Sequence, residues 1–176
     1  VTSGFLGFLT SYNNVDAQAN VRYDDYSDFD SKTTYNLGAA YHFTPEWRAG
    51  INYAKGYRVP TFNDLYYPGS ENPNLTPETS DNYETFVEYT TPKQSTRITG
   101  YYNKVDDFIA WTGSRSENVN EAEIKGVTLT SDWYLDDYLF GFSYDYQDAT
   151  DESDYTNRKD WKNNPINYNG NSLPIR

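Results

Sequence analysis

Seven stretches of this chain alternate apolar and polar residues with a period of two, and no other feature constrains its fold so strongly. In residues 15–24 the odd positions are Val, Ala, Ala, Val and Tyr, and the even positions are Asp, Gln, Asn, Arg and Asp. Successive side chains of a strand point to opposite faces of a sheet, so the pattern predicts strands. The other stretches are residues 34–43, 47–54, 82–89, 97–102, 126–133 and 139–146. None of the seven apolar faces carries a charged residue, although 23% of the chain is charged.

The connections between these strands alternate between short and long. Counting the less regular stretch 3–12 as an eighth strand, the short links are residues 13–14, 44–46, 92–94 and 135–137. The long links are residues 26–31, 58–79, 107–118 and 148 onward. A soluble β-sandwich would also separate its two faces, but this alternation favours an outer-membrane barrel with short periplasmic turns and long extracellular loops. The predicted fold class is therefore all-β, with antiparallel transmembrane β-barrel strands.

Composition agrees with strands that cross a membrane. The apolar surface is largely aromatic, with 19 Tyr, 9 Phe and 4 Trp, and many of these residues fall near strand ends, as in the aromatic girdles of membrane barrels. A mean hydropathy of −0.90 is compatible with such strands, because only every second residue faces lipid. The net charge of −12 makes nucleic acid an unsuitable partner, and the absence of cysteine excludes thiolate chemistry.

Two stretches resemble motifs of one receptor family. The first reads GYRVPTFNDLYY from Gly56 to Tyr67, and the second reads NPNLTPETS from Asn72 to Ser80. With the later stretches 100–109 and 118–127, they resemble in order the barrel motifs of TonB-dependent receptors. Glu71 stands where that family usually has glycine. Within the family, the stretch around Phe62 to Tyr67 is most similar to the cobalamin receptor branch.

This resemblance implies a barrel of about 22 strands in the bacterial outer membrane, filled by an N-terminal plug domain. Such receptors take up a scarce, bulky nutrient with energy relayed through TonB. About eight strands are recognised here, so we expect residues 1–176 to be a partial barrel, with the plug domain and the final strands lying outside it. The expected partners are the TonB complex, reached through the plug region, a bulky nutrient and outer-membrane lipid.

The longest internal link offers candidate ligand contacts. It combines aromatic and amide side chains with several prolines, a composition suited to a bulky ligand, although the same residues also build turns. The candidates are Arg58, Tyr66, Tyr67, Asn72 and Asn74.

Charged residues on the polar faces of the strands form a second group. We expect them to face the lumen or the plug, where water, one another or the plug can satisfy them. They are Arg22, Arg48, Glu84, Glu88, Arg97 and Asp132.

Nothing in the sequence calls for catalysis or a cofactor. His42 is the single histidine, so a Ser-His-Asp site would have to be built on this lumen-facing residue beside a short turn. We do not expect such a site. We predict no catalytic residues and no resident cofactor. The weak metal candidates are four aspartates whose carboxylate oxygens could bind calcium, although they lack the spacing of an EF-hand: Asp24, Asp25, Asp28 and Asp30.

The leading hypothesis is active transport of cobalamin. One alternative is a ferric-siderophore receptor, which the acidic loops disfavour because iron chelates of this kind are often anionic. The other alternative is a small structural or adhesion β-barrel.

Overall fold

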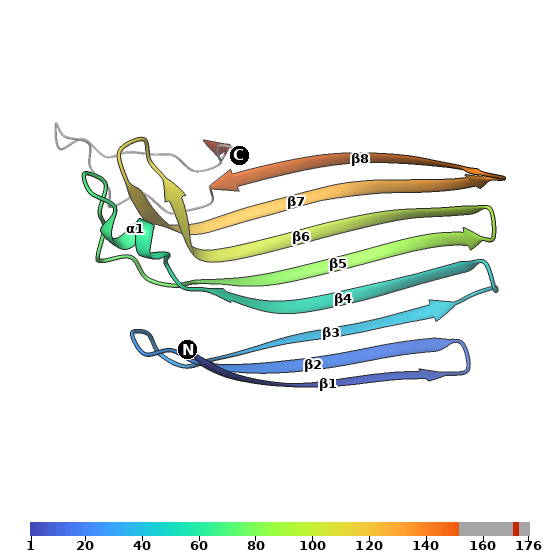
Figure 1. Ribbon diagram of the computed structural model, residues 1–176, viewed down its shortest axis with the longest axis horizontal. Coiled ribbons are helices and arrows are strands. Elements are labelled where there is room, and N and C mark those ends of the chain that lie inside the picture. Colours follow the sequence, from blue (N-terminus) through green and yellow to red (C-terminus); the bar gives the residue numbers. More distant parts are fainter. Residues whose placement is uncertain (152–170, 173–176) are drawn as a thin grey trace. The chain divides into compact units, whose positions relative to one another are not determined.

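The computed structural model describes residues 1–151 and 171–172, which are almost entirely β-strand (Figure 1). The strands are β1 (Thr2–Tyr12), β2 (Val15–Asp25), β3 (Lys32–His42), β4 (Trp47–Arg58), β5 (Glu78–Thr91), β6 (Gln94–Trp111), β7 (Ser116–Leu135), β8 (Tyr138–Asp151) and β9 (Asn171–Ser172). They form one sheet in sequence order, and the pairs β1–β2, β2–β3, β3–β4 and β8–β9 are antiparallel. The predicted all-β antiparallel fold class is confirmed.

The short links form where the sequence places them. Tyr12 pairs with Val15 across a two-residue turn in which Asn13 has a φ of 52°. Asp136, between β7 and β8, has a φ of 49°. Asn and Asp adopt this left-handed conformation more readily than most residues, which explains why tight turns occur at these two positions.

The chain divides into two compact units, which are described separately. We call residues 1–56, 81–102 and 125–147 the strand unit. The loop unit comprises Tyr57–Ser80, Asn103–Ile124 and the described part of the chain from Asp148 onward.

On the central strands β3 to β5 of the strand unit, the apolar faces are more exposed than the polar faces. On β3 the exposure alternates residue by residue: Leu37 and Tyr41 are exposed, whereas Asn36 and His42 are half-buried. Ile51 on β4 is 65% exposed. A soluble sandwich would bury this face against a second sheet. The observed arrangement is the one that a strand needs when lipid is its apolar solvent.

Aromatic rings gather along the apolar face as expected. Tyr53 lies between Tyr35 and Tyr83, with ring centroids 5.8 and 5.0 Å away, and Tyr102 continues the row 6.3 Å from Tyr83. Near the short turns, Trp47 lies 4.8 Å from Tyr89. Each row crosses neighbouring strands at one level, as an interfacial girdle does.

The structure of β1 explains why apolar and polar residues alternate poorly in its sequence. Its register with β2 places Leu6 opposite Val21 and Phe8 opposite Ala19, on the apolar face. Phe5 and Leu9 therefore point to the opposite face, so both sides of β1 carry large apolar residues.

The prediction of a long loop over residues 107–118 is wrong. Strand β6 continues to Trp111 and β7 begins at Ser116, which leaves a connection of residues 112–115. Asp107 has a φ of 55°, and this irregular residue interrupts the period-two pattern within β6. The loop was expected to begin at Asp148, but β8 extends to Asp151. Apart from β9, the rest of that expected loop lies outside the described residues.

The connection between β4 and β5 is not wholly irregular. It spans residues 59–77 and contains the helix α1 (Phe62–Tyr66). No helix in the described part of the chain is long and apolar enough to cross a membrane.

Candidate functional site

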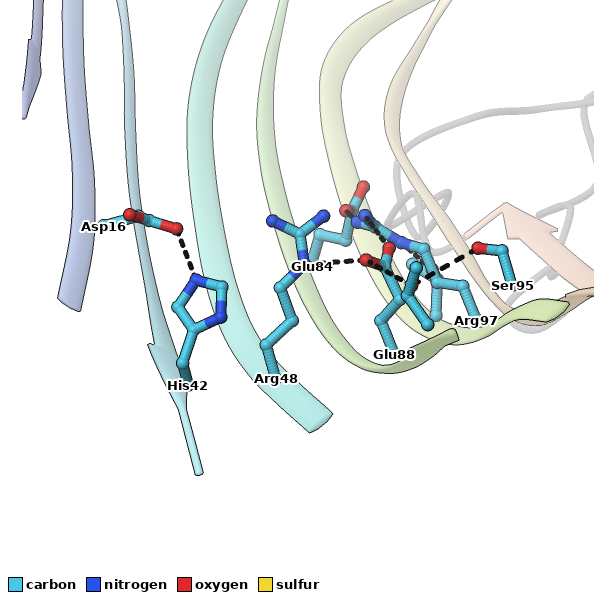
Figure 2. A network of polar contacts seen from close by, with 9 residues as sticks. Asp16, His42, Arg48, Glu84, Glu88, Ser95 and Arg97 are labelled. Carbon is cyan, nitrogen blue, oxygen red and sulfur yellow. Dashed lines mark hydrogen bonds and ion pairs between the residues drawn. The ribbon is translucent and has the colours of Figure 1, made fainter. Parts of the chain in front are cut away.

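The polar face of the strand unit carries a network of charged side chains centred on Glu88 (Figure 2). Arg48 Nε on β4 donates to Glu88 Oε1 on β5 at 2.7 Å. Arg97 on β6 lies 3.5 Å from Glu88 Oε2 and donates to Glu84 Oε1 at 3.1 Å. Three neighbouring strands are thus joined by alternating charges. Four of the six predicted lumen-facing residues belong to this network.

The aromatic ring of Phe86 lies next to both arginines of the network. The guanidinium carbon of Arg97 lies 3.7 Å from the ring centroid of Phe86, and that of Arg48 lies 5.6 Å from it. The ring in turn covers Gly50, where an added Cβ would meet Phe86 Cε1 at 2.6 Å and the carbonyl oxygen of Ala39 at 2.7 Å. Cation–π attraction to the Phe86 ring therefore helps to keep both guanidinium groups close to the sheet.

A hollow opens beside this network. Its polar lining includes Asp16, Gln18, Arg48, Asn52, Glu84 and Arg97. The buried Oδ1 atom of Asn52 has no hydrogen-bond partner in the described part of the chain. This oxygen is covered by protein atoms, so its hydrogen-bonding capacity is unused within the described residues.

Asp16 lies between Ser11 and His42. Ser11 Oγ donates to Asp16 Oδ1 at 2.6 Å. His42 Nε2 lies 2.7 Å from Asp16 Oδ2, as Figure 2 shows. A catalytic triad needs the imidazole between the hydroxyl and the carboxylate, so that it can take the hydroxyl proton. Here the carboxylate is central. This order holds the β1, β2 and β3 strands together and does not activate a nucleophile.

The other two predicted lumen residues lie apart from the network. Arg22 Nε donates to both carboxylate oxygens of Asp24, at 2.9 and 2.8 Å. Asp132 is exposed on β7. Of the calcium candidates, Asp24 is buried against Arg22, whereas Asp25, Asp28 and Asp30 are exposed. Within the described residues, no three acidic or histidine side chains come close enough together to hold a metal ion.

In the loop unit, Asp64 anchors the helix α1. Its carboxylate accepts hydrogen bonds from the backbone N–H and the hydroxyl of Thr61, at 3.0 and 2.6 Å, and from Ser116 Oγ at 2.9 Å. The Thr61 hydroxyl accepts in return from the Asp64 N–H, completing a capping box. Burial opposes ionisation of Asp64, but these hydrogen bonds and the charge of Arg58 outweigh it, so the pKa of Asp64 is lowered.

Amide side chains fix the rest of this connection. Asn72 Nδ2 donates to the carbonyl oxygen of Ser116 at 2.9 Å, and its Oδ1 accepts from the N–H of Asn74 at 3.3 Å. Asn118 Nδ2 donates to the carbonyl oxygen of Thr76 at 3.0 Å, while its Oδ1 accepts from the Thr76 N–H at 2.9 Å. The connection is therefore bound to β7 at two points.

Glu78 closes the base of the connection. Arg58 Nε and Nη2 donate to its two oxygens at 2.6 and 3.1 Å, in the bidentate geometry that Arg favours. Glu78 Oε2 also accepts from the N–H of Ile109 at 2.9 Å. The guanidinium group of Arg58 is thus hydrogen-bonded within the loop unit itself.

The five candidate ligand residues fall into two groups. Arg58 and Asn72 have their polar groups engaged within the loop unit, which is the turn-building role that the sequence left open. Tyr66, Tyr67 and Asn74 are exposed. Their contact with a ligand remains a prediction.

Sequence reasoning missed Phe62. It is 76% exposed, and its ring centroid lies 5.1 Å from that of Tyr66. A signal was present: Thr61 and Asp64 match the start of a capped helix, and positions 62 and 66 are then on one face.

These features define a class of protein. Antiparallel strands with an exposed apolar face, rows of aromatic rings and an ion-paired polar face form the wall of a transmembrane β-barrel. The family model described as "TonB dependent receptor-like, beta-barrel" matches residues 2–175. The chain belongs to this family.

Curated relatives and solved structures agree with that family. The chain is 39% identical over 144 residues to the vitamin B12 transporter BtuB of Photobacterium profundum, covering 77% of this chain and 24% of that protein. It is 34% identical to BtuB of Vibrio vulnificus, covering 82% of this chain and 24% of the relative. The chain therefore spans about a quarter of the length of these relatives.

Among solved structures, the ferric yersiniabactin uptake receptor FyuA of Yersinia pestis superimposes with a TM-score of 0.69 at 20% identity, covering 98% of this chain and 29% of that one. The copper transporter OprC gives a TM-score of 0.68 at 16% identity, over 85% of this chain and 28% of that one. At these identities the likeness concerns the fold alone. The predicted TonB-dependent receptor family and its barrel fold are confirmed.

Proposed function

We propose that this chain is part of an outer-membrane receptor that takes up cobalamin, with energy supplied through TonB. The observation that carries the proposal is the 39% identity to a vitamin B12 transporter over 77% of the chain. The exposed apolar face would contact outer-membrane lipid, and the ion-paired polar face would line the barrel. This proposal includes no chemical conversion of the nutrient, because a transporter moves its ligand across the membrane unchanged.

The polar face would also meet the plug domain of the whole receptor. The charged groups of the Glu88 network satisfy one another, and three of them line the hollow beside it. A plug segment that entered the hollow could therefore leave it without breaking the ion pairs.

The experiment is a binding titration of the full-length receptor in detergent. Cyanocobalamin and, separately, a panel of ferric siderophores are added, and free ligand is measured by equilibrium dialysis. Saturable binding of cyanocobalamin alone supports the proposal. The titration is repeated with EDTA, and a loss of affinity that calcium restores would identify a metal requirement of the receptor.

The second candidate is a ferric-siderophore receptor. The observation in its favour is the superposition on FyuA over 98% of this chain, which concerns the fold. Charge opposes it: residues 59–77 contain Asp64 and Glu71 but neither Lys nor Arg, so the connection repels anionic chelates. Binding of a ferric siderophore without cyanocobalamin would favour this second candidate.

A further inference from the structure

Two aromatic residues of the strand unit lie on its polar face. In the period-two pattern of β5, Phe86 stands between Glu84 and Glu88, and on β6 Tyr101 shares its face with Arg97. Both residues are half-buried. The rows of rings described above belong to the apolar face instead. A ring that stood upright on the polar face would project into the lumen of the barrel.

Each of these two rings lies over a glycine of the neighbouring strand. A Cβ atom added at Gly50 on β4 would meet Phe86 Cε1 at 2.6 Å and Cζ at 2.7 Å. A Cβ atom added at Gly126 on β7 would meet Tyr101 Cζ at 2.6 Å. No residue with a Cβ could occupy either position without displacing the ring. The two glycines therefore allow both rings to lie along the wall.

The Phe86 ring is in contact with both arginines of the Glu88 network. The guanidinium carbon of Arg97 lies 3.7 Å from the ring centroid, and that of Arg48 lies 5.6 Å from it. In the same positions, Arg48 pairs with Glu88 at 2.7 Å. Arg97 pairs with Glu84 at 3.1 Å. Phe86 and both arginines line the hollow of the polar face, so the ring restricts the guanidinium groups where they border the lumen.

Tyr101 makes a similar connection without an arginine. Its ring crosses Gly126, and its Oη lies 3.5 Å from Asp145 Oδ2 and 3.4 Å from Gln147 Oε1, both on β8. Neither of these groups carries a positive charge. Phe86 and Tyr101 thus each connect three consecutive strands on one face, but Phe86 is the ring against which guanidinium groups are held.

We propose that Phe86 is a positioning residue for transport, because its ring holds Arg48 and Arg97 in their ion pairs and keeps free guanidinium groups out of the passage. This inference rests on the proposed function and assigns the polar face a role in the uptake step. An arginine side chain has many rotamers, so without the ring the guanidinium group of Arg97 can turn into the lumen. There it would bind carboxylates of a segment that moves past the wall, which would slow each transport event.

The test separates uptake from binding. Initial uptake of labelled cyanocobalamin is measured in cells that carry the full-length receptor at equal surface levels, and Kd is measured by the same dialysis. Phe86→Ala should lower the uptake rate at saturating cyanocobalamin about fivefold, the scale of one cation–π contact, and should leave Kd within about twofold of the wild type. Phe86→Tyr keeps a ring over Gly50 and should keep both values within about twofold of the wild type.

A second substitution identifies the group that slows uptake. Phe86→Ala combined with Arg97→Gln lacks the released guanidinium group, so its uptake rate should recover to about half of the wild-type rate or more. A merely structural role of Phe86 predicts the opposite, because the double variant loses two sets of contacts and should be slower than Phe86→Ala.

Tyr101→Ala is the matched control. It removes a half-buried ring from over a glycine on the same face, but it releases no arginine, so uptake should stay within about twofold of the wild type. Resistance of the folded barrel to SDS at room temperature checks folding. Should Phe86→Ala not fold, Phe86→Leu keeps apolar volume over Gly50, removes the aromatic face and should show the same slow uptake and the same recovery with Arg97→Gln.

The outcomes separate the two proposals. Wild-type uptake of cyanocobalamin together with unchanged uptake in Phe86→Ala, or no recovery in the double variant, would overturn the positioning role and leave the proposed function standing. Equal slowing by Phe86→Ala and Tyr101→Ala would also overturn it. Absence of cyanocobalamin binding by the wild type would overturn the proposed function and, with it, the transport role of Phe86.

Discussion

The strand unit and the loop unit treat apolar side chains in opposite ways. In the loop unit, Leu75, Val105 and Ile109 are buried, as in a water-soluble protein. In the strand unit, residues of the same kind, such as Leu37 and Ile51, are exposed on the apolar face. Both units belong to one chain and contain the same kinds of polar side chains. Under the proposed function, water is the solvent of the loop unit and lipid is the solvent of the apolar strand face, which would account for the difference.

Polar side chains also find different partners in the two units. In the strand unit, hydrogen bonds between neighbouring strands occupy the backbone N–H and C=O groups. Charged side chains therefore pair with one another, as Arg48 does with Glu88. In the loop unit many backbone groups lack a ladder, and amides such as Asn72 and Asn118 satisfy them.

Glycine on a covered face of the strand unit should be the least tolerant position. A Cβ at Gly126 would collide with the Tyr101 ring and the carbonyl oxygen of Tyr146, and the latter cannot move without distorting β8. Gly126→Val in the full-length receptor should lower the free energy of unfolding by about 3 kcal/mol, measured by urea denaturation. At Gly100 on β6 an added Cβ would meet only Thr85 Cγ2, at an ordinary contact distance of 3.7 Å, so Gly100→Val should change stability by less than about 0.5 kcal/mol. Equal effects at the two glycines would contradict this account.

Removing the centre of the charge network should have the next largest effect. Glu88→Ala leaves Arg48 and Arg97 without their shared carboxylate, and we expect a loss of about 2 kcal/mol in the same denaturation measurement. Glu46, in the turn before β4, is exposed and serves as the control, since Glu46→Ala should have little effect. A loss no larger than that of Glu46→Ala would mean that the arginines are equally well solvated without Glu88.

The alternation of residues predicted most of the strand unit from sequence. Side-chain direction in a strand depends only on position parity, so the faces of β2 to β5 and the tight turns followed from local pattern. The same reasoning failed at Asp107, because a single residue with positive φ changes which face of the sheet the following residues of β6 point to.

The loop unit was less predictable because its structure depends on contacts between distant positions. The sequence identified Arg58 and Asn72 as polar groups near a ligand, but their partners, Glu78 and the carbonyl of Ser116, are 20 and 44 residues away. Only the folded chain shows which polar groups are already used. Phe62 shows the reverse, because a capping box is local and could have indicated the helix that exposes this ring.

Loss of the α1 anchor should affect the loop unit alone. Asp64→Ala removes the capping box and the link to Ser116, which should cost about 1 kcal/mol locally. Hydrogen exchange should show faster exchange of the Leu65 and Tyr67 amides, with no change in the strand unit. Asn63→Ala, on the same helix but outside the box, is the control. Faster exchange throughout the barrel would show that the two units do not open independently.

The same anchor should respond to acid with a defined sign. The folded-state pKa of Asp64 is lowered from its ordinary value of 3.8, so ionised Asp64 stabilises the loop at any pH above that value. This stabilisation is lost as the pH falls through the lowered pKa. Protection of the Leu65 amide, corrected for the intrinsic exchange rate, should stay constant from neutral pH to about pH 5 and decrease only below about pH 4. Asp64→Asn should remove this acid dependence.

The smallest effect is expected at the exposed hydrogen bond between Ser11 and Asp16. Ser11→Ala removes one donor, but water can replace it and His42 remains beside the carboxylate, so the loss should be about 0.5 kcal/mol or less. The carboxylate lies between hydroxyl and imidazole, so Ser11→Ala should also leave any background hydrolysis of a p-nitrophenyl ester unchanged. A fall in that hydrolysis would give Ser11 a chemical role that its geometry does not support. A large loss of stability would instead mean that strand-unit polar contacts are strong even where water reaches them, which would weaken the contrast with the backbone-directed contacts of the loop unit.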